Sequence, residues 1–274
     1  MIRLDCYKEA SRLAFAHMKP GVITNHVMTA QEYKADVAMG TLYAHKWPGG
    51  VLFMRKRKTY HMLSYYINDY SLPDCTLPED AFMEVAYKPS GVDDAYRAVR
   101  FWEQAGLLPI FERTRLTRNI TPSTKGGLPQ TEDSHKHTPH SHQYIEIALP
   151  PDADACMNMI YDCFDHHTGH IPDECELHDS IKAGHVLCMK DVDGSICGLL
   201  RWIPRAASIE IRQLALREDM RGKGMARNLL TRFVDMIGNN KITVWARDGY
   251  APALKSYTAS GFVADGWRSF VLTV

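Results

Sequence analysis

The sequence has no net charge, no long apolar run and no paired-cysteine motif. Its 32 lysines and arginines balance its 32 aspartates and glutamates, so no long-range field attracts a polyanion, and general nucleic-acid binding is excluded. A membrane-spanning helix needs about 18 or more apolar residues in a row. No such run occurs, and we expect no membrane association. The 7 cysteines are odd in number and form no CxxC pair, which favours reduced thiols over a disulfide framework.

The length of 274 residues is typical of two domains, each with its own core. With 45% hydrophobic and 23% charged residues, the composition is that of a globular protein. Charged residues interrupt the first 19 positions, so they lack the apolar region of a signal peptide. We therefore expect a cytoplasmic protein.

One segment separates the two halves of the chain. Residues 119–142 are rich in Thr, Ser, Pro, Gly and His and have no apolar periodicity, which is typical of a linker. The predicted domains are therefore 1–118 and 143–274. The alternative for the linker is a metal site, but a flexible segment supplies no fixed geometry for ligands. Its four histidines are His135, His137, His140 and His142.

The second half alternates strand and helix patterns. Period-2 and period-3.6 runs predict the order β-α-α-β-β-β-α-β-α-β, a mixed α/β unit. The amphipathic run at 224–237 predicts a helix that packs on the sheet and ends at Gly238. The predicted strands cover 143–149, 185–190, 196–203, 208–216, 241–246 and 262–274.

The first half shows a weaker form of the same order. Helices are expected at 7–18 and 30–38, and strands at 51–55, 60–67 and 82–87. The two halves also end alike, which indicates an internal duplication. The alternative is a generic helix-to-strand joint, because helices commonly end at glycine. The matching residues are Ala98, Trp102, Gly106, Leu107 and Arg113 in the first half, and Ala253, Tyr257, Gly261, Phe262 and Arg268 in the second.

A short basic, glycine-containing loop lies between a predicted strand and a predicted helix. It reads Arg221-Gly222-Lys223-Gly224-Met225-Ala226. Unpaired N–H groups and the positive end of the dipole make such a helix start a site for a pyrophosphate. The spacing fits neither a Walker A loop nor a dinucleotide fingerprint. A tight turn with two solvated cations is the alternative.

This loop resembles the [Q/R]xxGx[G/A] signature of the GNAT superfamily of acyl-CoA-dependent N-acetyltransferases. The resemblance covers residues 143–274 and includes the closing AxxxYxxxGF pattern from Ala253 to Phe262. It implies an α/β fold of the mixed, α+β type, with two GNAT-like domains, each a mostly antiparallel mixed sheet flanked by helices. The first half lacks the loop and resembles a degenerate repeat that supports the fold or shapes the acceptor cleft.

The resemblance also implies an acyl-CoA N-acyltransferase that moves an acetyl group directly from acetyl-CoA, a cosubstrate, to a primary amine of a small molecule or peptide. The strand ending at Leu216 would splay from strand 241–246, so that pantetheine lies between them. The implied cofactor-binding residues are Leu214, Leu216, Arg221, Gly222, Lys223, Gly224, Met225 and Ala226.

Two side chains match catalytic positions of the family. Tyr257 matches the acid that protonates the leaving thiolate. A phenol has a pKa of about 10, roughly that of an alkyl thiol, and can therefore supply this proton. The alternative is a core aromatic residue. Glu210 matches a position that supplies a general base in some members, or it forms only an ion pair with Arg212. The backbone N–H of Leu214 is the implied oxyanion donor. Tyr250 stands where many members have an asparagine.

A second cluster follows the first helix of the second half. Three interpretations are open for it: a metal site, contacts to the acceptor, or plain surface; no standard zinc spacing occurs, and no metal is expected. Its members are Cys163, Asp165, His166, His167, His170, Cys175 and His178.

The rival functional class is a non-catalytic acyl-CoA-binding sensor or partner-binding module that kept the cofactor cleft. Trp202, Trp245 and Tyr250 either line an acceptor pocket or pack in the core. The sequence does not identify the acceptor, the acyl-chain preference or the oligomeric state. It is compatible with an oligomer.

Overall fold

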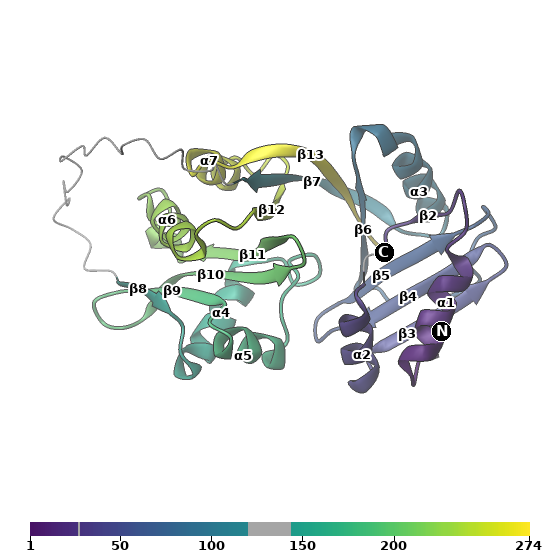
Figure 1. Ribbon diagram of the computed structural model, residues 1–274, viewed down its shortest axis with the longest axis horizontal. Coiled ribbons are helices and arrows are strands. Elements are labelled where there is room, and N and C mark those ends of the chain that lie inside the picture. Colours follow the sequence, from purple (N-terminus) through teal and green to yellow (C-terminus); the bar gives the residue numbers. More distant parts are fainter. Residues whose placement is uncertain (27, 120–143) are drawn as a thin grey trace.

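One continuous sheet carries both halves of the chain. The computed structural model describes residues 1–26, 28–119 and 144–274, so the predicted linker and its four histidines lie outside the described residues apart from Asn119. Within the described part, 13 strands form the sheet, and β2 pairs with β5 off the main path. The order along the main path is β1-β3-β4-β5-β6-β13-β7-β12-β11-β10-β9-β8. Figure 1 shows a lobe at each end of this sheet.

The first half contributes three helices to the described structure. Helix α2 begins with a capping box, in which Thr29 and Glu32 satisfy each other's backbone N–H groups. The elements are β1 (Ile2–Arg3), α1 (Tyr7–His17), β2 (Ile23–Thr24), α2 (Ala30–Ala38), β3 (Leu42–Trp47), β4 (Gly50–Lys56), β5 (His61–Ile67), β6 (Ala81–Tyr87), α3 (Val92–Gln104) and β7 (Leu108–Arg118).

The second half follows the predicted order of strands and helices. No helix in the described ranges has the length and apolar character needed to cross a membrane. The elements are β8 (Tyr144–Ile147), α4 (Ala153–Cys163), α5 (Glu174–Lys182), β9 (Val186–Lys190), β10 (Ile196–Arg205), β11 (Ser208–Leu216), α6 (Met225–Ile237), β12 (Ile242–Arg247), α7 (Ala251–Ala259) and β13 (Val263–Thr273).

The strand order is the same when read from either end of the sheet. Strands β1, β3, β4, β5, β6 and β13 on one side match β8, β9, β10, β11, β12 and β7 on the other. The pairs β5–β6 and β11–β12 are parallel, whereas the other pairs in the described structure are antiparallel. The mostly antiparallel mixed sheet is as predicted, and the repeated topology supports the duplication. Residues 68–80, between β5 and β6, contain no counterpart of α6.

The last strand of each half lies in the sheet of the other half. Strand β13 pairs with β6, and β7 pairs with β12, while β7 and β13 pair with each other across the middle of the molecule (Figure 1). Around the centre, Arg268 pairs with Thr114 and Ser269 with Arg113. The two sheets that were predicted therefore form one sheet by exchange of two strands. The domain limits 1–118 and 143–274 stay a prediction.

Helices cover both faces of each lobe. Helices α1 and α2 lie over one buried cluster and α3 over a second, while α4 and α5 cover a third and α6 and α7 a fourth. The exchange extends to these cores: Leu116 of β7 packs with α6, and Phe270 and Leu272 of β13 pack with α3. Each lobe therefore depends on a strand from the other half for its core.

Candidate active site

A wedge opens between the parallel strands β11 and β12. They pair only at Ile209–Ile242, Glu210–Thr243 and Ile211–Val244. On the other side of β11, Gln213 pairs with Arg201 and Ile211 with Trp202, which leaves Arg212 as an extra residue in a β-bulge. Because a bulge bends its strand and increases the local twist, β11 leaves β12 directly after the last pair. The splay predicted for these strands is present.

The start of helix α6 offers unpaired backbone N–H groups at the open end of the wedge. Gly222 and Gly224 have φ values of 73° and 81°, a region that other L-residues rarely adopt. Gly224 is the N-cap and supplies no side-chain cap, and the first turn holds no acidic residue. The first N–H groups of the helix and its positive dipole end are therefore free for an anion.

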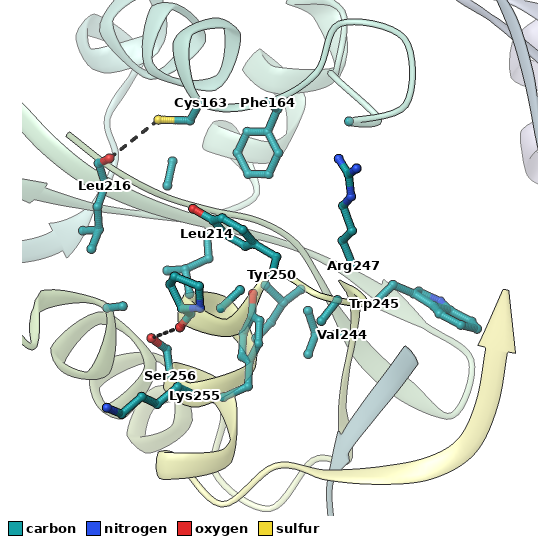
Figure 2. A pocket seen from close by; sticks show the side chains of 18 of the residues that line it. Cys163, Phe164, Leu214, Leu216, Val244, Trp245, Arg247, Tyr250, Lys255 and Ser256 are labelled. Atoms are coloured by element: carbon teal, nitrogen blue, oxygen red, sulfur yellow. Dashed lines mark hydrogen bonds between the residues drawn. The ribbon is translucent and has the colours of Figure 1, made fainter. Parts of the chain in front are cut away.

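Basic side chains surround this helix start. Arg221 lies against β11, where its Nε donates to the Leu216 carbonyl oxygen at 3.1 Å and its Nη2 lies 3.7 Å from Cys163 Sγ. Cys163 Sγ also contacts the Leu216 carbonyl, at 3.7 Å (Figure 2). Arg227 of α6 and Lys255 of α7 line the same space. The arrangement suits a ligand with several phosphate charges.

A cavity of about 950 Å³ runs from the start of α6 through the wedge. This volume is in the range of small-molecule and cofactor sites. Of the predicted cofactor-binding residues, Leu214, Leu216, Arg221, Gly222, Gly224, Met225 and Ala226 line the cavity, and Lys223 does not. Both predicted catalytic residues, Tyr257 and Glu210, also line it. The fold thus brings together predicted site residues that lie up to 47 positions apart, from Glu210 to Tyr257.

Tyr257 lies on α7 where that helix packs against the wedge. Its side chain is 6% exposed and contacts Phe262 edge-on. Burial raises the pKa of the phenol well above its ordinary value. Tyr257 therefore stays protonated at neutral pH, and the raised pKa also makes the phenol a weaker acid.

Glu210 lies on β11 between two arginines. Arg205 Nε donates to Oε2 at 3.0 Å and Arg212 Nη1 donates to Oε1 at 2.5 Å. The carboxylate is 13% exposed. Burial alone raises its pKa, but Arg212 and Arg205 outweigh burial and lower it to about 2. Because an efficient base has a pKa near the working pH, the ion pairs make Glu210 a weak proton acceptor.

The first half supplies one wall of the cavity through the exchanged strand β7. Phe111 and Arg113 of β7 line the cavity. Arg113 forms an ion pair with Glu84 of β6, and its Nη2 donates to the Thr168 carbonyl oxygen at 2.6 Å. Glu84 also contacts His170 Nε2 at 2.9 Å. Strand β7 of the first half therefore forms part of the cavity wall.

The loop between α4 and α5 forms the adjacent part of the cavity wall. His170 has a φ of 51° in this loop, and Gln213 of β11 donates to its carbonyl oxygen at 2.9 Å. Burial and the charges of Arg212 and Arg113 lower the pKa of His170 well below its ordinary value, so the imidazole is neutral at neutral pH. Contacts from both halves hold this loop in place.

The cluster from Cys163 to His178 divides between cavity and surface. Cys163, Asp165 and His170 line the cavity, whereas Cys175 is exposed. Asp165 accepts hydrogen bonds from the N–H groups of His167 and Thr168. In the described ranges, no three His, Cys, Asp or Glu residues are placed to hold a metal ion.

The three aromatic candidates differ in position. Trp245 and Tyr250 line the cavity, and Tyr250 is 51% exposed. Figure 2 shows the Tyr250 side chain extending into the space below the end of α4, where Cys163 and Phe164 lie. Trp202 is 3% exposed and packs against Phe233 in the core. The packing interpretation is therefore right for Trp202.

The sequence prediction missed several cavity residues. Arg227 and Lys255 could have been suspected, because each lies one or two positions from a predicted site residue. Phe111 and Arg113 reach the cavity because β7 is inserted beside β12. Sequence patterns do not reveal that insertion.

Comparisons with known proteins agree with this geometry. Residues 153–262 match the model of the Acetyltransferase (GNAT) family. No curated protein matches the chain. Among solved structures, a GCN5-related N-acetyltransferase from Sphaerobacter thermophilus is 14% identical with a TM-score of 0.55, over 82% of this chain and 76% of that one. A GNAT-family acetyltransferase from Colwellia psychrerythraea is 11% identical with a TM-score of 0.53, over 99% and 97%. These likenesses show a shared fold.

Proposed function

Because the chain belongs to the GNAT acetyltransferase family through residues 153–262, we propose that it is an acyl-CoA-dependent N-acyltransferase that transfers an acetyl group directly to a primary amine. The observation that carries the proposal is the wedge between β11 and β12, which opens onto the glycine-bounded start of α6. A cosubstrate with a diphosphate at one end and an extended arm fits this shape, with the arm between the strands. Acetyl-CoA has both features and supplies the activated acyl group.

Different residues around the wedge would bind different parts of acetyl-CoA. The N–H groups of Met225, Ala226 and Arg227 would receive the diphosphate, with Arg221 and Lys223 adding charge. Backbone groups of Leu214 and Leu216 face the widening gap, because β11 has no strand partner on that side beyond Ile211. They would bond the amide groups of the pantetheine arm in place of the missing strand.

Transfer to an amine requires three roles from the chain. The N–H of Leu214 would stabilise the oxyanion that forms when the amine nitrogen attacks the thioester carbonyl. Tyr257 would donate its proton to sulfur as the C–S bond breaks. The amine must also lose a proton, and Glu210 is the proposed acceptor; its ion pairs weaken it in this role. Tyr257 therefore has the stronger support of the two.

Calorimetric titration of acetyl-CoA tests the cofactor site. In Gly224→Ala the new methyl group meets no atom within 4 Å, but a φ of 81° costs a non-glycine residue roughly 1–2 kcal/mol, so the helix start should shift. Arg221→Ala removes a charged donor worth about 1.5–3 kcal/mol. We expect each variant to weaken binding at least about tenfold. Gly238→Ala, at the other end of α6 with a φ of 63°, is the matched control.

Release of free thiol separates an enzyme from a sensor. Protein with acetyl-CoA and a panel of primary amines should release thiol in proportion to acetylated amine. A sensor or partner-binding module would bind acetyl-CoA without releasing thiol. Unchanged acetyl-CoA affinity in both site variants would contradict the proposed cofactor site altogether.

A further inference from the structure

Two arginines lie directly opposite each other beside the cavity. In the antiparallel pair of β7 and β12, Arg113 is the partner of Arg247. Like charges in directly opposed positions destabilise a sheet. Both residues line the cavity, and burial together with the charges of Arg212 and Arg247 lowers the pKa of Arg113 to about 10. The site therefore concentrates positive charge at a cost to the fold.

The neighbouring carboxylates are already engaged with other groups. Glu84 pairs with Arg113 and contacts His170. Glu210 is shared by Arg205 and Arg212. Asp165 accepts from backbone N–H groups of its own loop.

Arg247 is left without an anionic partner in the described part of the chain. Its guanidinium lies over the ring of Phe111, 4.2 Å from the ring centroid. A guanidinium stacked in this way keeps its planar edge of N–H donors available for an oxyanion.

Arg247 lies on the other face of the sheet from the predicted diphosphate site. Ile242, Val244 and Ala246 of β12 pack in the cluster under α6 and α7. Because side chains alternate along a strand, Trp245 and Arg247 lie on the opposite face. Figure 2 shows Arg247 on the same side as Phe164, with Lys255 and Ser256 on the other side. Arg247 is therefore placed away from the cofactor's phosphates.

We propose that Arg247 binds a negatively charged oxyanion group, a carboxylate or a phosphate, on the acceptor amine. This inference rests on the proposed N-acyltransferase function and narrows its substrate to anionic amines. Arg113 and Arg212 add positive potential around the group, while their own carboxylate partners keep them in place. The Phe111 ring and the first half of the chain thereby set acceptor specificity through strand β7.

Matched amines test the inference. Glycine, β-alanine and 4-aminobutanoate are compared with their carboxamides, and 2-aminoethyl phosphate with ethanolamine, by thiol release from acetyl-CoA. We expect the anionic member of at least one pair to have a kcat/KM about tenfold or more above its neutral counterpart, and the pair that responds identifies carboxylate or phosphate. Equal or better use of the neutral amines refutes the inference and leaves the proposed function intact.

Variants at Arg247 test whether the preference for anionic amines depends on this residue. Arg247→Gln should raise KM for the preferred anionic amine by about 10- to 100-fold, with acetyl-CoA affinity unchanged, and Arg247→Lys should restore it in part. Arg232→Gln, an exposed arginine of α6 outside the cavity, is the control and should behave as wild type. Weaker acetyl-CoA binding in Arg247→Gln, or an unchanged KM, contradicts the inference.

A binding measurement tests the role of Arg247 even if no amine is acetylated. If no amine releases thiol, the proposed function fails, and the same amines are titrated by calorimetry into protein saturated with CoA. Binding of an anionic amine that Arg247→Gln weakens supports the inference. Absence of heat for every anionic amine overturns it.

Discussion

The exchange of β7 and β13 predicts that the two halves unfold as one unit. Leu272 belongs to the second half by sequence, but it is 0% exposed and packs with Trp102 and Leu107 in the core of the first lobe. It pairs with Met83 on one side and Pro109 on the other. Removal of its side chain should therefore weaken the first lobe directly, and the second lobe through β7, which β12 needs as a neighbour.

The expected magnitude follows from complete burial. Substitution of a buried leucine by alanine costs about 2–5 kcal/mol, depending on how far the cavity collapses. Such a loss is a large part of the roughly 5–15 kcal/mol of stability typical of a folded protein. We expect Leu272→Ala to lower the free energy of unfolding by this amount in both lobes.

Amide hydrogen exchange with mass spectrometry reads the two lobes separately. Peptides from β4 report on the first lobe and peptides from β10 on the second. Both should lose the same protection in Leu272→Ala, and also in Leu230→Ala, which changes a fully buried side chain of α6. Val192→Ala, at a position 72% exposed, is the control. Loss of protection in β4 while β10 keeps its own would refute the reasoning.

Three further predictions follow from the site and the sheet. Tyr257→Phe should lower kcat by about 10²- to 10⁴-fold with unchanged acetyl-CoA affinity in calorimetry, because it removes only the hydroxyl and keeps the buried ring; an unchanged kcat would remove Tyr257 from the mechanism. The folded-state pKa of Glu210, about 2, is below its ordinary 4.5, so its ion pairs contribute stability, at most roughly 3 kcal/mol, above pH 4.5. That contribution is lost as the pH falls towards 2, and the stability difference between wild type and Glu210→Gln, from urea titrations at several pH values, should shrink over this window. A fragment of residues 143–274 lacks β7, which forms six residue pairs with β12, and should aggregate or fail to bind acetyl-CoA, whereas co-expressed residues 1–118 should rescue it; a stable monomer that binds acetyl-CoA would count against the exchange.

The local features of this protein are determined by neighbouring residues and are visible in the sequence. Helix α2 and strand β11 coincide with their predicted ranges at 30–38 and 208–216, and the other predicted helices and strands differ by a few residues at their ends. The anion site depends on consecutive residues, from Arg221 to Ala226, because glycines at positive φ and free N–H groups are local properties of a helix start. The family resemblance follows from the same segment.

The tertiary structure alone decided the strand exchange and the character of the acceptor side. Pairing of β13 with β6 and of β7 with β12 joins residues from opposite halves of the chain, and no local pattern specifies which of two similar edges a strand will join. The same exchange brings Phe111 and Arg113 to the cavity. The ionisation of Glu210 likewise depends on Arg205 and Arg212 in three dimensions. Electrostatic interactions and strand pairing depend on distances between residues that are far apart in the sequence. Those distances are set only when the chain folds.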